Sequence, residues 1–186
     1  GISEDKVILF FGFIRKYKGL DILIQSIGQV FEKNNKIKLL IAGECYEDKD
    51  RYLELIDNTK YKDKIEWIER FIPDDEISDY FSASDVVVLP YKNASQSGVI
   101  PLSYHYDKPV ITSDLASLTE VIEEGKTGFV FKLNDIDSLT SRIIDFFKDY
   151  DSNIYEKNIK TYKKNFSWKN FVISIEDIYK RLNERR

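Results

Sequence analysis

The element that decides the fold is the run Val7-Ile8-Leu9-Phe10-Phe11-Gly12. An unbroken apolar run that ends at a glycine is typical of a parallel strand buried on both faces. A helix is predicted over 20–31, because apolar side chains recur there every three or four positions. A second apolar run, Ile37–Ala42, again ends at a glycine. The order strand, helix, strand predicts a β-α-β unit.

The same alternation continues along the rest of the sequence. Further strands are predicted over 64–68, 85–89, 109–112 and 128–131. Helices are predicted over 74–82, 97–106, 136–148 and 153–164, and in a segment where Leu53 and Ile56 share one face. A last helix begins at Ser167, a good N-cap residue, with an apolar face of Trp168, Phe171, Val172, Ile175, Ile178 and Leu182. We therefore expect one three-layer α/β/α, Rossmann-like domain over 1–186, with a mostly parallel sheet of about six strands.

Composition excludes several classes of protein. The 28 Lys and Arg residues against 32 Asp and Glu give a net charge of -4, which argues against a nucleic-acid-binding protein. The 12 Phe, 12 Tyr and 2 Trp supply enough apolar surface to argue against disorder. No apolar run is long enough to span a bilayer, and Gly1–Lys6 lacks the pattern of a secretory signal.

Three scarce residue types narrow the choice further. A single cysteine, Cys45, rules out an internal disulfide and favours a reducing, cytoplasmic compartment. A single histidine, His105, excludes the usual multi-histidine metal sites and is expected to be a structural residue. The chain has no methionine, not even at position 1, so we expect a fragment of a longer protein. The glycine motifs of NAD-dependent enzymes and of P-loop NTPases are absent.

Two loops at predicted strand ends have the features of an anion site. Residues 12–19 place Arg15, Lys16 and Lys18 before a helix, where the helix dipole and free amides favour a phosphate. Residues 90–99 are polar and small, which lets a ligand approach the backbone near a helix start. The alternatives are a solvated basic turn and an ordinary capped connection. Because both loops follow parallel strands, we expect them at the same edge of the sheet.

Other charged motifs are weaker. The pairs Asp48/Asp50, Asp135/Asp137 and Asp149/Asp151 occur at about the frequency that chance predicts, and we expect no metal site in them. Four lysines cluster on one predicted helix, namely Lys157, Lys160, Lys163 and Lys164. Such a cluster is usually a solvated face, with a membrane surface as the alternative partner.

An ordered series of short motifs runs through nearly the whole chain. It consists of Phe10-Phe11-Gly12 with Lys18-Gly19, Leu40–Gly43, Phe71-Ile72-Pro73, Ala83–Pro90, Lys108–Ile111, Leu118–Ile122 and Gly125–Val130. In this series the chain resembles the C-terminal, donor-binding domain of retaining glycosyltransferases of the GT-B class, the group 1 family. The resemblance implies two Rossmann-like domains in the whole enzyme, with the acceptor bound by an N-terminal domain that this chain lacks.

The resemblance also implies which residues act. Lys18 matches the family's diphosphate-binding lysine, whereas Phe13 stands at the usual arginine position, so Arg15 is assigned that role and both cations are taken as catalytic. Further donor contacts are implied for Gly12, Phe13, Arg70, Phe71, Ile72, Ser95, Gln96, Ser97, Gly98, Val99 and Glu120. The family's pair of glutamates is missing, because Ala94 and Leu102 occupy those positions. The segment Ser95–Val99 resembles the replacement found in a subgroup of such enzymes.

The implied activity is transfer of a sugar from a nucleoside diphosphate to a glycan or lipid-linked acceptor in polysaccharide biosynthesis, without a metal or other cofactor. The helix within 166–186 would pack toward the missing domain, so the fragment alone is expected to be inactive. Expected partners are a nucleotide sugar, that domain and the inner face of a membrane, but no nucleic acid. The alternatives are a non-catalytic module that binds a sugar nucleotide or phosphosugar, and a receiver-like signalling domain, which lacks its acidic cluster here.

Overall fold

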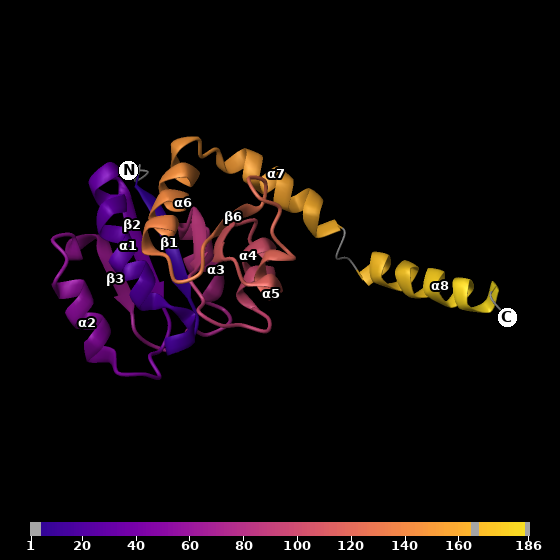
Figure 1. The fold of residues 1–186 in the computed structure, drawn as a ribbon, viewed down its shortest axis with the longest axis horizontal. Helices are drawn as coiled ribbons and strands as arrows, with labels where there is room; N and C mark the ends of the chain where they lie inside the picture. The colour runs from indigo at the N-terminus through magenta and orange to yellow at the C-terminus, as the bar shows by residue number, and fades with distance from the viewer. Residues whose placement is uncertain (1–4, 165–167, 185–186) are drawn as a thin grey trace.

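The computed structural model describes residues 5–164 and 168–184, and its centre is one parallel sheet (Figure 1). The strands lie in the order β3-β2-β1-β4-β5-β6, and every neighbouring pair is parallel. Their bounds are β1 (Lys6–Phe11), β2 (Ile37–Ala42), β3 (Ile65–Ile68), β4 (Val86–Leu89), β5 (Val110–Ser113) and β6 (Gly128–Phe131). The prediction of a Rossmann-like sheet of about six parallel strands is confirmed.

Helices connect the strands and cover both faces of the sheet. Their bounds are α1 (Leu20–Lys33), α2 (Lys49–Asp57), α3 (Ile77–Ala83), α4 (Val99–His105), α5 (Ala116–Thr119), α6 (Ile136–Lys148), α7 (Ser152–Lys163) and α8 (Trp168–Glu184). Two short 3-10 helices, η1 (Lys16–Lys18) and η2 (Lys62–Lys64), precede α1 and β3. The described helices include none that is long and apolar enough to cross a membrane.

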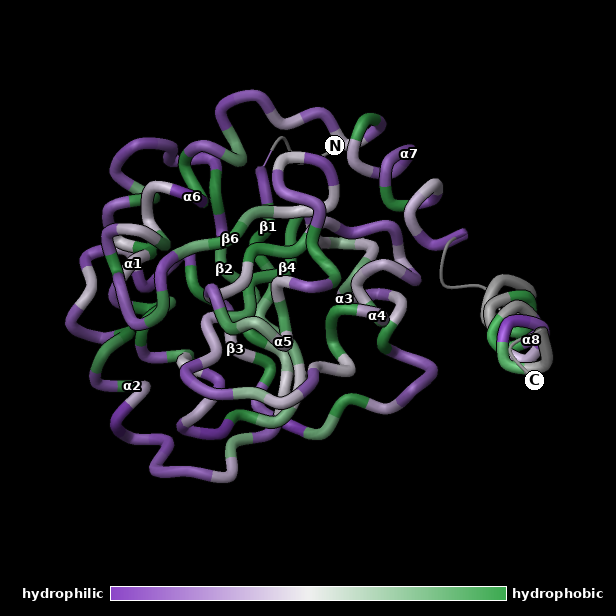
Figure 2. The backbone as a smooth tube through the Cα atoms, turned by 45° about the vertical axis from the view of Figure 1, so that its right-hand side comes forward, coloured by the Kyte–Doolittle hydropathy of each residue, from purple (hydrophilic) through white to green (hydrophobic). Residues whose placement is uncertain are grey.

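The alternation of side chains along the strands creates two cores. Ile8 and Phe10 of β1 pack with residues of α1 and α6 on one face, whereas Leu9 and Phe11 pack with residues of α3 and α4 on the other. Figure 2 shows the hydrophobic strands gathered in the centre, with hydrophilic segments outside them. Each fully buried aliphatic or aromatic side chain contributes about 1.5–3 kcal/mol. Burial on both faces explains why these strands are continuous apolar runs.

The structure corrects two details of the predicted helices. The helix expected over 74–82 is α3, which begins only at Ile77, because the Glu76 N–H bonds to the Pro73 carbonyl and closes a turn first. In α2 the buried residue is Tyr52, whose ring meets Trp67, while Leu53 is exposed. The predicted N-cap Ser167 lies outside the described residues, and α8 follows it.

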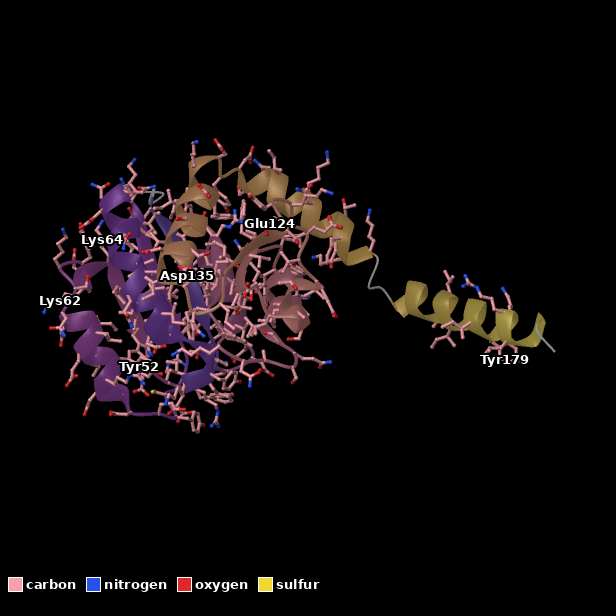
Figure 3. All side chains as sticks on the ribbon, in the orientation of Figure 1. Tyr52, Lys62, Lys64, Glu124, Asp135 and Tyr179 are labelled. Carbon is pink, nitrogen blue, oxygen red and sulfur yellow. The ribbon has the colours of Figure 1, made fainter. Side chains whose placement is uncertain are left out.

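The three Asp-x-Asp motifs supply helix caps. Asp48 accepts a hydrogen bond from the Asp50 N–H at the start of α2, and Asp151 accepts one from the Asn153 N–H at the start of α7. Asp135 caps α6 through the Ser138 N–H, and Figure 3 places its side chain at that helix start. These motifs therefore have a structural explanation in the first turn of a helix.

Candidate donor site at the sheet switch point

The strand order reverses direction between β1 and β4, which are direct neighbours. The chain leaves β1 toward α1 on one face and leaves β4 toward α4 on the other face. In open parallel sheets such a reversal opens a crevice at the carboxyl ends of the strands, where ligands bind. The two segments predicted as anion sites, 12–19 and 90–99, follow β1 and β4 and therefore border this crevice.

The first loop is fixed to the loop that follows β2. Gly12 adopts a φ of 92°, a conformation that a residue with a side chain rarely takes. Ile14 is buried, and its backbone exchanges hydrogen bonds of 2.9 and 3.1 Å with Glu44 and Tyr46. These backbone bonds fix the first loop to the loop after β2. The first loop itself borders the crevice.

Lys18 is buried in this loop, with a relative exposure of 8%. Burial, followed by the neighbouring charge of Arg15, lowers the pKa of Lys18 from 10.5 to about 8. Its Nζ atom lies 5.9 Å from the centroid of the Tyr91 ring, and a Cβ atom on Gly12 would approach it to 3.1 Å. Within the described residues, Lys18 forms no ion pair. A buried cation without a carboxylate partner is costly, and such groups mark functional sites more often than surface lysines do.

Arg15 supplies a second positive charge next to Lys18. Its guanidinium lies 5.0 Å from the ring centroid of Tyr46, whose hydroxyl donates to Glu44. Lys16, which lies between Arg15 and Lys18 in the sequence, is exposed, and its backbone N–H donates to Glu47. The loop therefore holds Arg15 and Lys18 close enough to repel each other, an arrangement that an anion between them would stabilise.

The second loop contains Tyr91, which is buried and whose hydroxyl lies near the Ser97 side chain. Burial raises the pKa of Tyr91 to about 12. The Ser97 hydroxyl accepts a hydrogen bond of 3.2 Å from the N–H of Val99, the first residue of α4. That amide is therefore already bonded, and the predicted role of Val99 in holding a phosphate would need this bond to be exchanged.

A pocket of about 880 Å³ opens beside this loop. Its lining includes the predicted residues Ser95, Gln96, Ser97, Gly98 and Glu120, together with residues of α4 and α7. Ser117, another lining residue, donates a hydrogen bond of 2.6 Å to the Ala94 carbonyl and so joins the segment after β5 to the loop. The structure thus brings together predicted residues from two separate segments of the chain.

The predicted residues after β3 are divided in their surroundings. Ile72 is buried in the core, and the guanidinium of Arg70 is paired with Glu76 and bonded to the Tyr80 hydroxyl. Phe71 is exposed and lies beside Phe13, with 6.1 Å between the ring centroids. Of this group, only Phe71 therefore joins the surface that leads to the crevice.

Three residues of this edge were missed by the sequence analysis. Tyr46 contacts both Phe13 and Arg15, Tyr91 links Lys18 to Ser97, and Asp21 is a buried carboxylate on the first turn of α1. Their positions in the sequence could have indicated them, because each lies within a few residues of the carboxyl end of a strand or of a loop that borders the crevice. The side-chain contacts themselves need the folded structure.

Two of the remaining predicted residues, His105 and Lys163, line the pocket beside the second loop. His105 is exposed, and its ring lies against Tyr106. On α7, Lys160 pairs with Glu156 and Asp107, and Lys163 also pairs with Asp107. Among the described residues, no three His, Cys, Asp or Glu side chains are grouped as metal ligands.

Comparison with known proteins gives consistent results over the whole chain. An uncharacterized glycosyltransferase of Methanocaldococcus jannaschii is 29% identical over 188 residues, covering 97% of this chain and 46% of that protein. Sucrose-phosphate synthase from Thermosynechococcus elongatus has the same fold, with a TM-score of 0.79 and 19% identity over 99% of this chain and 47% of its own. Anabaena HepE, solved in complex with UDP and glucose, has a TM-score of 0.77 at 19% identity, over 97% and 48% of the two chains.

The chain spans about half the length of the curated relatives it matches. The solved structures named above show the shared GT-B architecture of the fold. The family model for glycosyl transferases group 1 matches residues 1–166, which is most of the sequence. The chain therefore belongs to the glycosyl transferases group 1 family.

Proposed function

We propose that this chain is the nucleotide-sugar-binding half of a retaining glycosyltransferase. The single observation that carries the proposal is the pair Arg15 and Lys18 at the switch point between β1 and β4, with Lys18 buried and free of any ion pair among the described residues. This is the geometry expected of a diphosphate site in an open parallel sheet. The UDP and glucose bound by Anabaena HepE support a nucleotide sugar as the ligand class.

The two cations have a direct role in the proposed reaction. When the bond between the sugar and the diphosphate breaks, negative charge develops on the leaving phosphate. Cations already held in place stabilise that charge without further rearrangement, and one such contact is worth about 2.7–4 kcal/mol in the barrier. Arg15 and Lys18 would neutralise the leaving group, so this mechanism requires no divalent metal.

We assign the sugar to the pocket beside the second loop. Hydroxyl and amide groups of Ser95, Gln96 and Ser97 line it and can hydrogen-bond sugar hydroxyls, and Glu120, which also lines it, offers a carboxylate. The exposed rings of Phe13 and Phe71 provide an apolar surface on the other side of the crevice for the nucleobase. The donor would thus extend across the switch point from one loop to the other.

The acceptor, a glycan or lipid-linked sugar, would bind to an N-terminal domain of the whole protein. Large apolar residues of α8 are exposed, including Val172, Ile175, Ile178 and Leu182, and Tyr179 projects from this helix in Figure 3. An apolar stripe of this kind needs a partner surface. Relatives about twice as long as this chain support a second domain as that partner.

One observation favours a second candidate, a non-catalytic module that binds a sugar nucleotide or phosphosugar. Leu102 is partly buried against the apolar cluster that α4 shares with the sheet, and Ala94 also packs there. Neither position offers a carboxylate to the ribose or the sugar. Binding without turnover in the whole protein would favour this candidate.

Isothermal calorimetry on this chain with UDP, GDP, ADP and their sugar conjugates tests the proposal. We expect at least one of them to bind with a millimolar or lower dissociation constant, and we expect no turnover by this chain alone. Substitution Lys18→Ala should weaken that binding more than Lys16→Ala, the matched exposed lysine. Absence of binding to every nucleotide at millimolar concentration contradicts the proposal. Sugar transfer by the longer protein then separates an enzyme from a binding module.

A further inference from the structure

The two loops that border the crevice are joined along a seam, formed by Tyr17, Gly19 and Asp21 on one side and by 90–92 on the other. The Lys92 N–H donates to the Tyr17 carbonyl at 2.6 Å. The rings of Tyr17 and Tyr91 meet edge to face, with 5.9 Å between their centroids. A Cβ atom on Gly19 would lie 1.9 Å from the Pro90 carbonyl oxygen, so the two backbones touch there.

Asp21 is the charged centre of the seam. Its side chain is 8% exposed, and its Oδ2 atom accepts hydrogen bonds from Lys92 Nζ at 2.7 Å and Arg51 Nη2 at 2.9 Å. The Oδ1 atom is buried and has no hydrogen-bond partner among the described residues. A buried carboxylate loses its hydration, so the bonds to these two cations have to compensate for that loss. The ion pair with Lys92 is therefore a strong constraint on where the second loop lies.

The ammonium of Lys92 is held by Asp21, unlike that of Lys18. Tyr91, the residue before Lys92, has its ring centroid 5.9 Å from Lys18 Nζ and its hydroxyl near Ser97. Any shift of Lys92 therefore moves the side chain that lies between the buried cation and the small-residue loop. The distance between the two halves of the donor site depends on the seam.

We propose that Asp21 is a positioning residue that, through its ion pair with Lys92, fixes the spacing between the loop of Lys18 and the loop of Ser95–Gly98. The inference rests on the proposed function, because the donor is taken to contact both loops. The sign of the effect is diagnostic. Removing a negative charge beside a cation site strengthens anion binding by electrostatics alone, whereas loss of positioning weakens it.

Calorimetry on this chain measures that sign, with whichever of UDP, GDP or ADP the unmodified chain binds most tightly. Asp21→Asn and Lys92→Met should each raise the dissociation constant about tenfold. The double variant should have about the same dissociation constant as either single variant, because both substitutions break the same interaction. Arg51→Met is the matched control, because Arg51 bonds to the same Oδ2 atom from α2, outside the seam. It should leave the constant within about threefold. An unchanged or lower constant for Asp21→Asn overturns the inference.

A second measurement needs no nucleotide. The burial that sets the pKa of Lys18 at about 8 depends on the two loops staying together. NMR titration of ¹³C-labelled lysine should show this pKa rising toward 10.5 in Asp21→Asn and Lys92→Met, but not in Arg51→Met. An unchanged Lys18 pKa in Asp21→Asn overturns the inference whether or not a nucleotide binds. Failure of the unmodified chain to bind any nucleotide contradicts only the proposed function.

Discussion

At the scale of single residues, Lys18 combines an energetic cost with a proposed use. Burial lowers its pKa from 10.5 to about 8. At 1.36 kcal/mol per pH unit, the protonated side chain therefore reduces the free energy of unfolding at pH 7 by about 3 kcal/mol. The cost persists because the charge is kept at the site where the donor diphosphate is expected. Sequence reasoning found Lys18 by its place before Gly19, but its burial depends on Tyr91, a residue distant in the chain.

The first prediction separates stability from binding at this residue. Lys18→Met removes the buried charge and keeps an apolar stem, so the free energy of unfolding at pH 7 should increase by about 1–3 kcal/mol. Nucleotide binding should weaken by about tenfold or more, because a charge-assisted contact is lost. Thermal unfolding and calorimetry measure the two effects. Lys16→Met, the exposed control, should change neither, and a less stable Lys18→Met would contradict the burial argument.

The second prediction concerns pH. In the free protein Lys18 is protonated below about 8, and the cation is the form that binds a phosphate. Affinity should therefore be steady from pH 6.5 to 7.5 and fall by up to about tenfold per pH unit above 8, as a single linked proton requires. Calorimetry with a nucleotide sugar avoids titration of a terminal phosphate. In Lys18→Met the decline above pH 8 should disappear, and a wild-type profile that is flat to pH 10 would refute the assignment.

At the scale of elements, the start of α1 is in close contact with the residues that follow β4. This contact fixes the two loops at the carboxyl ends of the central strands. The apolar runs and the helical spacing were sufficient to predict the strands and the helices around them, because burial on both faces leaves a strong pattern. They were not sufficient for α3, whose start is set by a turn at Pro73, or for Tyr52, whose burial depends on Trp67. Tertiary contacts of this kind leave no period in the sequence.

The third prediction tests the contact between α1 and β4 with two glycines. Gly19→Ala places a Cβ atom 1.9 Å from the Pro90 carbonyl oxygen at a φ of 70°, so it should destabilise the fold by about 3 kcal/mol or more. Gly28→Ala, within α1 and with no atom within 4 Å of the new Cβ, should instead stabilise it by about 0.5–1 kcal/mol. Urea unfolding of both variants gives the comparison. Equal effects of the two substitutions would mean that the loops are not in contact as described.

At the scale of the whole molecule, strand order decides where the site can be. The sequence predicts a parallel sheet and two loops rich in anion-binding groups. Those loops come together because β1 and β4 are adjacent strands in the sheet. Arg70, which the resemblance implies as a donor contact, follows β3 at the edge of the sheet and is paired with Glu76 there. One Asp of each Asp-x-Asp pair caps a helix, a role that the sequence analysis did not assign to these pairs.

The last prediction is that sugar transfer by the longer protein does not need a metal. The positive charge at the leaving diphosphate would come from Arg15 and Lys18. A divalent ion between these two cations would be repelled by both. Asp48 and Asp135 accept capping hydrogen bonds, and among the described residues no three His, Cys, Asp or Glu side chains are grouped as metal ligands. Transfer should therefore keep its rate within about twofold in excess EDTA, since metal-assisted steps lose orders of magnitude when the ion is removed. Asp135→Asn, which keeps an oxygen for the cap, should be equally active. Loss of transfer in EDTA with recovery on adding magnesium or manganese would show that a metal, and not this pair of cations, neutralises the leaving group.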